Sequence, residues 1–230
     1  MEEGRPTMSE RTTVARQTTD QFELCLWESQ ADGETQYEVV MNGVFIMASY
    51  NQVSSTALVD RAMARLGPRE DVRVLVGGLG MGLSAAAAVA IGSVSQVDVV
   101  ELEPVIVNWN RTWFADLNAH CLEDPRLDTV VGDFHDYVMT ADARYDLVCL
   151  DVDNGPEMLV RDSNARIYGP DFLRAIREIV KPDGVFSLWA YTRNEDLVRE
   201  ITEVFSACSV EEVWEEHERR RQSYCIYLAP

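Results

Sequence analysis

An apolar run in the second half of the chain ends abruptly in residues that can do chemistry. The run YDLVC (residues 145–149) is followed directly by LDVDNGPE (residues 150–157), which holds two aspartates, an amide and a Gly-Pro turn. Doubly wound sheets bind their ligands at the carboxyl ends of the strands, so Asp151 is a candidate active-site residue. The alternative is an acidic turn, which explains the Asn-Gly-Pro part well but explains two acids beside an apolar strand less well.

A glycine-rich segment, VLVGGLGMGLS at residues 74–84, lies between a strand-like run and an alanine-rich helical run. Glycines at such a place permit a tight turn and let a ligand approach the backbone N–H groups at the start of a helix. Loops of this kind serve dinucleotides, sulfonium cofactors or plain packing, but the strand before it and the helix after it favour a cofactor site. The glycines concerned are Gly77, Gly78, Gly80 and Gly82.

Two more acids follow strand-like runs. Glu101 in VVELEP can accept hydrogen bonds from both hydroxyls of a ribose, whereas Glu103 has the milder role of favouring the helix that starts at Pro104. Asp133 in VVGDFHDYV can accept a hydrogen bond from an adenine amino group, with Phe134 packed on the base. An NAD site does not call for this second acid. The loop and both acids therefore favour S-adenosylmethionine or a relative.

The elements that must position these residues alternate between strands and helices from residue 72 onward. This alternation predicts an α/β fold with a Rossmann-like, doubly wound, mostly parallel sheet of seven strands. The tail at residues 209–229 reads as two strands around a charged turn, which predicts a C-terminal antiparallel hairpin. Strands are expected at residues 72–78, 96–103, 127–133, 145–151 and 185–191, and helices at 83–91, 104–117, 134–141, 168–180 and 194–205.

The segment before residue 72 has a different pattern. Three short strand-like runs, with Asn42-Gly43 as a hairpin turn, predict a small β-hairpin module, and residues 53–67 have helical spacing. The first residues are polar and do not form a signal peptide. The expected organisation is a disordered leader at 1–19, an N-terminal β-hairpin module at 20–52 and a Rossmann-like S-adenosylmethionine-binding domain at 53–230.

Composition narrows the partners and the location. A net charge of −19 disfavours nucleic acid and anionic membranes, and it suits a cationic ligand, although solubility alone accounts for it. The five cysteines have no CxxC spacing and read as reduced core residues of a cytoplasmic protein. The three histidines lie in unrelated contexts, and no segment approaches the roughly 20 apolar residues that span a bilayer. We expect a small-molecule substrate and no metal.

Taken together, GGLGMG, VELEP, VGDFHDYV and YDLVCLDVDNGPEML resemble the spermidine synthase (aminopropyltransferase) family. The chain looks most like the short bacterial spermidine synthase-like branch, over about residues 22–229. That branch pairs a reduced N-terminal β-hairpin module with a methyltransferase-type Rossmann domain. Family members commonly dimerise, so a homodimer is an expected assembly, and the oligomeric state stays open.

The resemblance also implies roles for single residues. The segment from Gly77 to Gly82, called the glycine loop below, would hold the amino-acid side of the sulfonium cofactor. Glu101 would hold the ribose and Asp133 the adenine. Asp151 matches the acid that holds or deprotonates the attacking amine, beside the cofactor. The remaining expected contacts are Ser55, Leu102 and Phe134 for the cofactor, and Tyr50, Asn154 and Tyr168 around the substrate.

The chain departs from the family pattern in three places. Family members usually carry GGGDGG, whose Asp meets the amine of decarboxylated S-adenosylmethionine, and here Leu79-Gly80 stands there. The family's DEFxYxE-like polyamine segment corresponds to NQVSSTA at residues 51–57, and DxxDP appears as DVDNGP with the second acid displaced to Asp153. Because a diamine would lose most of its anionic partners, we expect chemistry other than classical spermidine synthesis, and ordinary S-adenosylmethionine becomes acceptable.

Three functions are compatible with these residues. The first is displacement of the aminocarboxypropyl arm with release of methylthioadenosine, either by an external amine or by intramolecular cyclisation to a small cyclic amino acid. Proximity would drive this reaction, since the sulfonium is already a good leaving group. The second is methyl transfer to a small molecule, and the third is a non-catalytic adenosyl-ligand binder, which the complete set of cofactor motifs favours least.

Overall fold

The computed structural model describes residues 11–230 except residues 21, 32, 153 and 218–219. The chain divides into two compact units, one up to Asn51 and one from Gln52 to Pro230. The predicted boundary between residues 52 and 53 falls one residue from this division. Each unit is described by itself.

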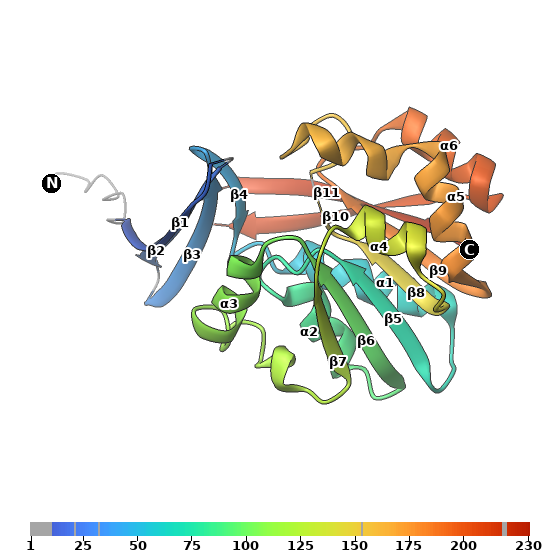
Figure 1. Ribbon diagram of the computed structural model, residues 1–230, viewed down its shortest axis with the longest axis horizontal. Coiled ribbons are helices and arrows are strands. Elements are labelled where there is room, and N and C mark those ends of the chain that lie inside the picture. The colour runs from blue at the N-terminus through green and yellow to red at the C-terminus, as the bar shows by residue number, and fades with distance from the viewer. Residues whose placement is uncertain (1–10, 21, 32, 153, 218–219) are drawn as a thin grey trace, which may run out of the picture. The chain divides into compact units, whose positions relative to one another are not determined.

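The first unit is a four-stranded antiparallel sheet in the order β1-β2-β3-β4 (Figure 1). Its turn between β3 and β4 has left-handed backbone at Asn42 (φ 50°) and Gly43 (φ 81°), as a tight hairpin requires. Leu24, Leu26 and Val39 are buried within it. The strands are β1 (Thr12–Thr18), β2 (Glu23–Ala31), β3 (Glu34–Met41) and β4 (Val44–Ala48).

The expectation of a disordered leader over residues 1–19 is wrong for its last part. Residues 12–18 form β1, which pairs antiparallel with β2. The sequence of β1, TTVARQT, lacks the alternation of apolar and polar residues that marks a half-buried strand, and most of its residues are exposed. Its backbone pairing with β2 orders it, and the exposed ion pair of Arg16 with Glu23 (3.1 Å) adds little. Residues 1–10 lie outside the described residues.

The second unit is built on a seven-stranded sheet in the order β10-β11-β9-β8-β5-β6-β7. The five strands from β9 to β7 are parallel, and β11 and β10 add an antiparallel hairpin at one edge. This topology confirms the predicted fold class. The strands are β5 (Val72–Gly77), β6 (Val94–Glu101), β7 (Leu127–Val131), β8 (Tyr145–Leu150), β9 (Val180–Ala190), β10 (Ser209–His217) and β11 (Arg220–Ala229).

Helices cover both faces of this sheet (Figure 1). The helices α4, α5 and α6 bury one large core cluster, and α1 packs against α2 and β9 on the other side. In the described part of the chain, no helix is both long and apolar enough to cross a membrane. The helices are α1 (Val53–Leu66), α2 (Leu83–Ala90), α3 (Pro104–Thr112), α4 (Phe134–Thr140), α5 (Pro170–Ile179) and α6 (Glu195–Phe205), with 3-10 turns at Cys121–Glu123 and Asp162–Tyr168.

Two helix boundaries differ from prediction, and the sequence around Pro170 explains one of them. The helix predicted from residue 168 begins at Pro170, because a residue before proline disfavours helical backbone and proline suits the first helical position. The helix predicted over 104–117 ends at Thr112. Residues 181–184, between the helix predicted at 168–180 and the strand predicted at 185–191, lie inside β9, opposite a register shift between Tyr145 and Leu147 that marks a bulge in the ladder.

Candidate functional site

The glycine loop and the end of β8 are interlocked through their backbones. The N–H of Asp151 donates to the carbonyl oxygen of Gly77 (2.8 Å). Gly78 has φ +88°, and a Cβ added there would lie 2.2 Å from the carbonyl oxygen of Asp151. Only glycine satisfies both the left-handed backbone and this close approach. The two segments that the sequence singled out therefore meet at the carboxyl ends of β5 and β8.

Phe134 supports the glycine loop from within the core. Its ring is buried and meets Phe172 edge to face, with ring centroids 6.0 Å apart. A Cβ at Gly77 would lie 2.7 Å from the Phe134 ring, so the ring fills the space that this glycine leaves open. Its contact with an adenine base stays a prediction.

Two buried asparagines brace the other side of the loop. The Asn110 side-chain amide donates to the carbonyl oxygen of Gly80 (2.8 Å), and Asn118 donates to Asn110 Oδ1 (2.8 Å). A Cβ at Gly82 would lie 2.5 Å from Asn110 Oδ1. Sequence reasoning missed both residues. The available signal was the four-residue spacing of Asn110 from Ile106, which places a polar residue on the apolar face of a helix.

Glu101 ties the end of β6 to the loop. It is 8% exposed, and its two carboxylate oxygens accept the backbone N–H groups of Leu79 (2.9 Å) and Glu103 (2.8 Å). Burial raises the pKa of Glu101, and these two N–H groups oppose that rise. Each oxygen keeps a lone pair for a ribose hydroxyl, but that contact stays a prediction. The neighbouring Leu102 is exposed.

Asp133 caps the start of α4 and is also paired with an arginine. Its Oδ1 accepts the His135 backbone N–H (2.9 Å), and its Oδ2 pairs with Arg166. A second arginine of the same segment, Arg161, pairs with Glu103. Two ion pairs thus connect the segment after β8 to the acids that follow β6 and β7, and neither pair was foreseen from the sequence.

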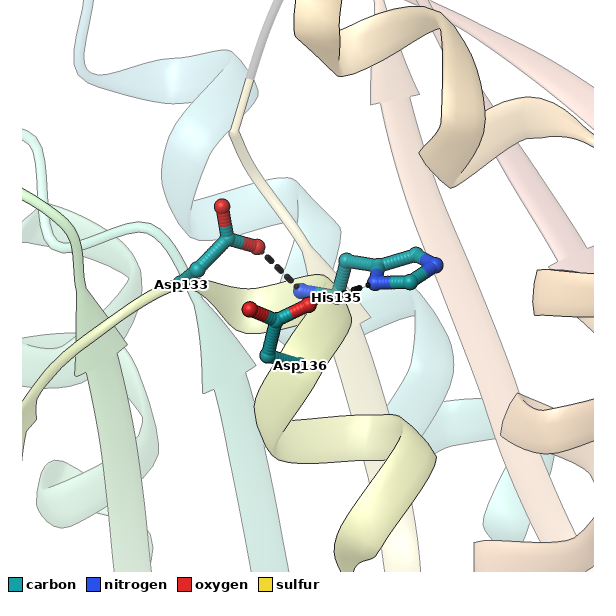
Figure 2. Close-up of side chains that lie close together, drawn as sticks. All are labelled: Asp133, His135 and Asp136. Carbon is teal, nitrogen blue, oxygen red and sulfur yellow. Dashed lines mark hydrogen bonds and ion pairs between the residues drawn. The ribbon is translucent and has the colours of Figure 1, made fainter.

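Asp133, His135 and Asp136 lie close enough together to share a cation, with candidate ligand atoms within 4.8 Å of one another (Figure 2). Arg166 pairs with both carboxylates, and the His135 ring stacks on Phe172 at 5.6 Å between centroids. The guanidinium already supplies the positive charge that such a cluster attracts. We therefore assign no metal to it.

The Asp151 side chain is partly buried at the same edge. Its Oδ2 accepts a hydrogen bond from the Ser84 hydroxyl (2.7 Å), and that hydroxyl also lies 3.1 Å from the Ser55 carbonyl oxygen. Burial raises the pKa of Asp151, and the Ser84 hydrogen bond opposes the rise. A raised pKa brings a carboxylate closer to the range that suits a general base.

The other expected substrate residues are distributed differently. Tyr50 belongs to the first unit, where its hydroxyl donates to Glu38 (2.9 Å). The Asn154 carbonyl accepts the Tyr191 N–H (2.9 Å), which anchors the loop after β8 to the end of β9. Tyr168 is 5% exposed and packs in the core cluster. Asp153 lies outside the described residues. The pocket roles of these residues stay predictions.

The mostly parallel sheet with helices on both faces defines a Rossmann-type fold, the class in which ligands bind at the carboxyl edge of the sheet. Within that class, residues 54–210 match the model of the spermine/spermidine synthase domain. This match covers more than half of the chain, so the chain belongs to that family.

Curated relatives carry polyamine aminopropyltransferase names. The chain is 28% identical over 175 residues to polyamine aminopropyltransferase 1 of Streptomyces coelicolor. The matched region covers 74% of this chain and 32% of the relative. It is 29% identical over 160 residues to the polyamine aminopropyltransferase of Pyrobaculum calidifontis, which covers 67% of this chain and 54% of the relative. The chain thus spans between about a third and about half of the length of these relatives.

Solved structures of spermidine synthases have the same fold. The Thermotoga maritima enzyme has a TM-score of 0.76 at 17% identity, over 94% of this chain and 72% of that one. A spermidine synthase in complex with the transition-state analogue AdoDATO has a TM-score of 0.75 at 17% identity, over 94% of this chain and 71% of that one. At this identity the likeness establishes the fold alone.

Proposed function

We propose that this chain transfers the three-carbon arm of an adenosyl sulfonium to a nucleophile and releases methylthioadenosine. The observation that supports the proposal is the contact of Asp151 with the glycine loop and the start of α2, made by its backbone with Gly77 and Gly78 and by its carboxylate with Ser84. The polyamine aminopropyltransferase names of the relatives support the same reaction class. The proposed donor is S-adenosylmethionine or its decarboxylated form.

In the proposed reaction, a neutral amine attacks the arm carbon that is bonded to sulfur. The C–N bond forms as the C–S bond breaks, and its electron pair stays on the sulfur of methylthioadenosine. The attacking nitrogen becomes positively charged and passes one proton to Asp151. The neutral thioether is a good leaving group, so the leaving group needs no further activation. Holding the amine close to the arm carbon therefore supplies much of the rate enhancement. The raised pKa of Asp151 favours its acceptance of that proton.

Donor binding is proposed to use Glu101 for the ribose, Asp133 for the adenine and the glycine loop for the amino-acid end. The loop has Leu79-Gly80 where aminopropyltransferases usually carry an acid. Without that acid, the α-carboxylate of S-adenosylmethionine meets no repulsive partner in the loop. We therefore propose a reaction other than classical spermidine synthesis, with either an external amine or the donor's own amine or α-carbon as the nucleophile.

Product analysis tests the proposed function directly. The chain is incubated with S-adenosylmethionine or with its decarboxylated form, each with and without a diamine, and the products are separated by liquid chromatography and mass spectrometry. We expect methylthioadenosine, and release without a diamine would point to cyclisation. S-Adenosylhomocysteine as the product would contradict the proposal and identify a methyltransferase. Tight binding with neither product would identify a non-catalytic binder.

Glu101→Gln tests the donor site separately from the chemistry. A glutamine oxygen can accept only one of the two N–H groups, of Leu79 and Glu103, and its amide group would face the other donor. We expect affinity for methylthioadenosine, measured by calorimetry, to fall about tenfold or more, because hydrogen bonds to a charged group contribute about 1.5–3 kcal/mol. Asp128→Asn, an exposed acid on β7, is the matched control. Unchanged affinity in Glu101→Gln would remove this residue from the ribose site.

A further inference from the structure

Ser84 places one hydroxyl between two segments that meet at the proposed base. It lies in the first turn of α2 and is 2% exposed. Its Oγ is 2.7 Å from Asp151 Oδ2 and 3.1 Å from the carbonyl oxygen of Ser55 in the first turn of α1. One side chain therefore connects α1, α2 and the end of β8.

A serine hydroxyl has a single hydrogen, so it can donate to only one of these two acceptors at a time. When Asp151 is ionised, the hydroxyl donates to Oδ2. When Asp151 is protonated on Oδ2, the carboxyl group donates to Ser84 Oγ, and the hydroxyl turns to the Ser55 carbonyl oxygen. When the proton is on Oδ1, Oδ2 still accepts from Ser84. Every protonation state of Asp151 keeps a hydrogen-bond partner.

We propose that Ser84 is the positioning residue for Asp151, which it holds in one orientation while the carboxylate takes the proton of the nucleophile. The inference rests on the proposed function, in which Asp151 is the base. Ser84 itself touches neither donor nor nucleophile in this scheme. Its hydroxyl rotates between its two acceptors, and no proton leaves it for Ser55.

The titratable groups on the surrounding elements either stay neutral or have other partners. Within the described residues, the side chain that hydrogen-bonds the Asp151 carboxylate is Ser84. On β8, burial raises the pKa of the Cys149 thiol to about 12, so this group stays neutral. Glu101 on β6 is bound to backbone N–H groups of the loop. Glu215 on β10 is buried and accepts the Ser54 N–H (2.7 Å) at the start of α1. The hydrogen bond from Ser84 is the contact that lowers the pKa of Asp151.

The test compares Ser84→Ala with Ser84→Thr, which keeps the hydroxyl. The control is Ser95→Ala, which removes a hydroxyl that donates to the carbonyl oxygen of Val72 at the start of β5 (3.4 Å). Methylthioadenosine release is measured against pH. In Ser84→Ala we expect kcat to fall about tenfold, with KM for the donor within about twofold, because one hydrogen bond to a charged group is lost. The acid limb of the profile should move to higher pH, since the ionised form of Asp151 loses its stabilising donor. Ser84→Thr should restore the limb.

An unchanged rate and acid limb in Ser84→Ala, with turnover lost in Asp151→Asn, would overturn the role of Ser84 and leave the proposed function standing. Normal turnover in Asp151→Asn would instead overturn the proposed function. Should Ser84→Ala fail to fold, Ser84→Cys gives the same comparison with a weaker donor of similar shape. An intermediate shift of the acid limb is then expected, and an unshifted limb would count against the inference.

Discussion

Asp151→Asn should reduce the release of methylthioadenosine by about 10²–10⁴-fold, because the amide cannot accept the proton of the nucleophile. The amide oxygen still accepts the Ser84 hydroxyl, and the backbone contacts with Gly77 and Gly78 do not involve the side chain. Affinity for methylthioadenosine should therefore change by less than about threefold. Single-turnover kinetics and calorimetry measure the two quantities. Full turnover would remove Asp151 from the reaction.

The same substitution should change the free energy of unfolding in a direction that depends on pH. Burial raises the pKa of Asp151 in the folded chain above its unfolded value. A carboxyl group whose pKa is raised by folding contributes to the free energy of unfolding at a pH below its unfolded pKa. That contribution is lost as the pH rises through the folded pKa. At pH 8 the Asn variant should therefore unfold at the same or higher urea concentration than the wild type. Its advantage should shrink as the pH falls, and a large loss of stability at pH 8 would contradict this account.

Gly78→Ala should damage both the fold and the ligand site. The new Cβ must accept φ +88° and a 2.2 Å approach to the Asp151 carbonyl oxygen, so the loop or the end of β8 has to move. We expect the free energy of unfolding to fall by about 2–4 kcal/mol. Affinity for methylthioadenosine should fall more than tenfold, because the loop N–H groups lose their positions. Urea unfolding and calorimetry check these two expectations.

Gly92→Ala is the matched control for this substitution. A Cβ at Gly92 meets nothing within 4 Å, and its φ lies outside the left-handed range. Its free energy of unfolding should stay within about 1 kcal/mol of the wild-type value. Equal losses in Gly78→Ala and Gly92→Ala would show that the close approach to Asp151 has no special weight.

The fold was predictable because its signals are local. Apolar runs separated by helical segments specify parallel strands with crossovers, and only a few topologies obey the handedness rule. The sequence also predicted that Gly78 and Asp151 lie at one edge, since both come just after strands of a parallel sheet. The strand order was not predicted, and it is the pairing of β8 with β5 that turns this shared edge into a direct contact.

The rest depended on long-range contacts that leave little local signal. The exposed residues of β1 gain order from pairing with β2. Asn110 and Asn118 look like ordinary polar residues until the loop packs on them. The pairing of Arg166 with Asp133 joins residues 33 apart, and many acids were available to that arginine. Such partners are fixed by tertiary packing, which spacing along the chain does not reveal.

The interlock of Gly78 with the backbone of Asp151 separates the frame of the site from its chemistry. Apart from the hydrogen bond between the Ser84 and Asp151 side chains, the contacts that hold the two segments together are main-chain contacts at residue 151, which any amino acid except proline can make. Position 78 is thereby restricted to glycine, whereas position 151 can change its side chain and keep the architecture. A family built on this frame can diversify its reactions by exchanging one side chain at a strand end, without redesigning the loop beside it.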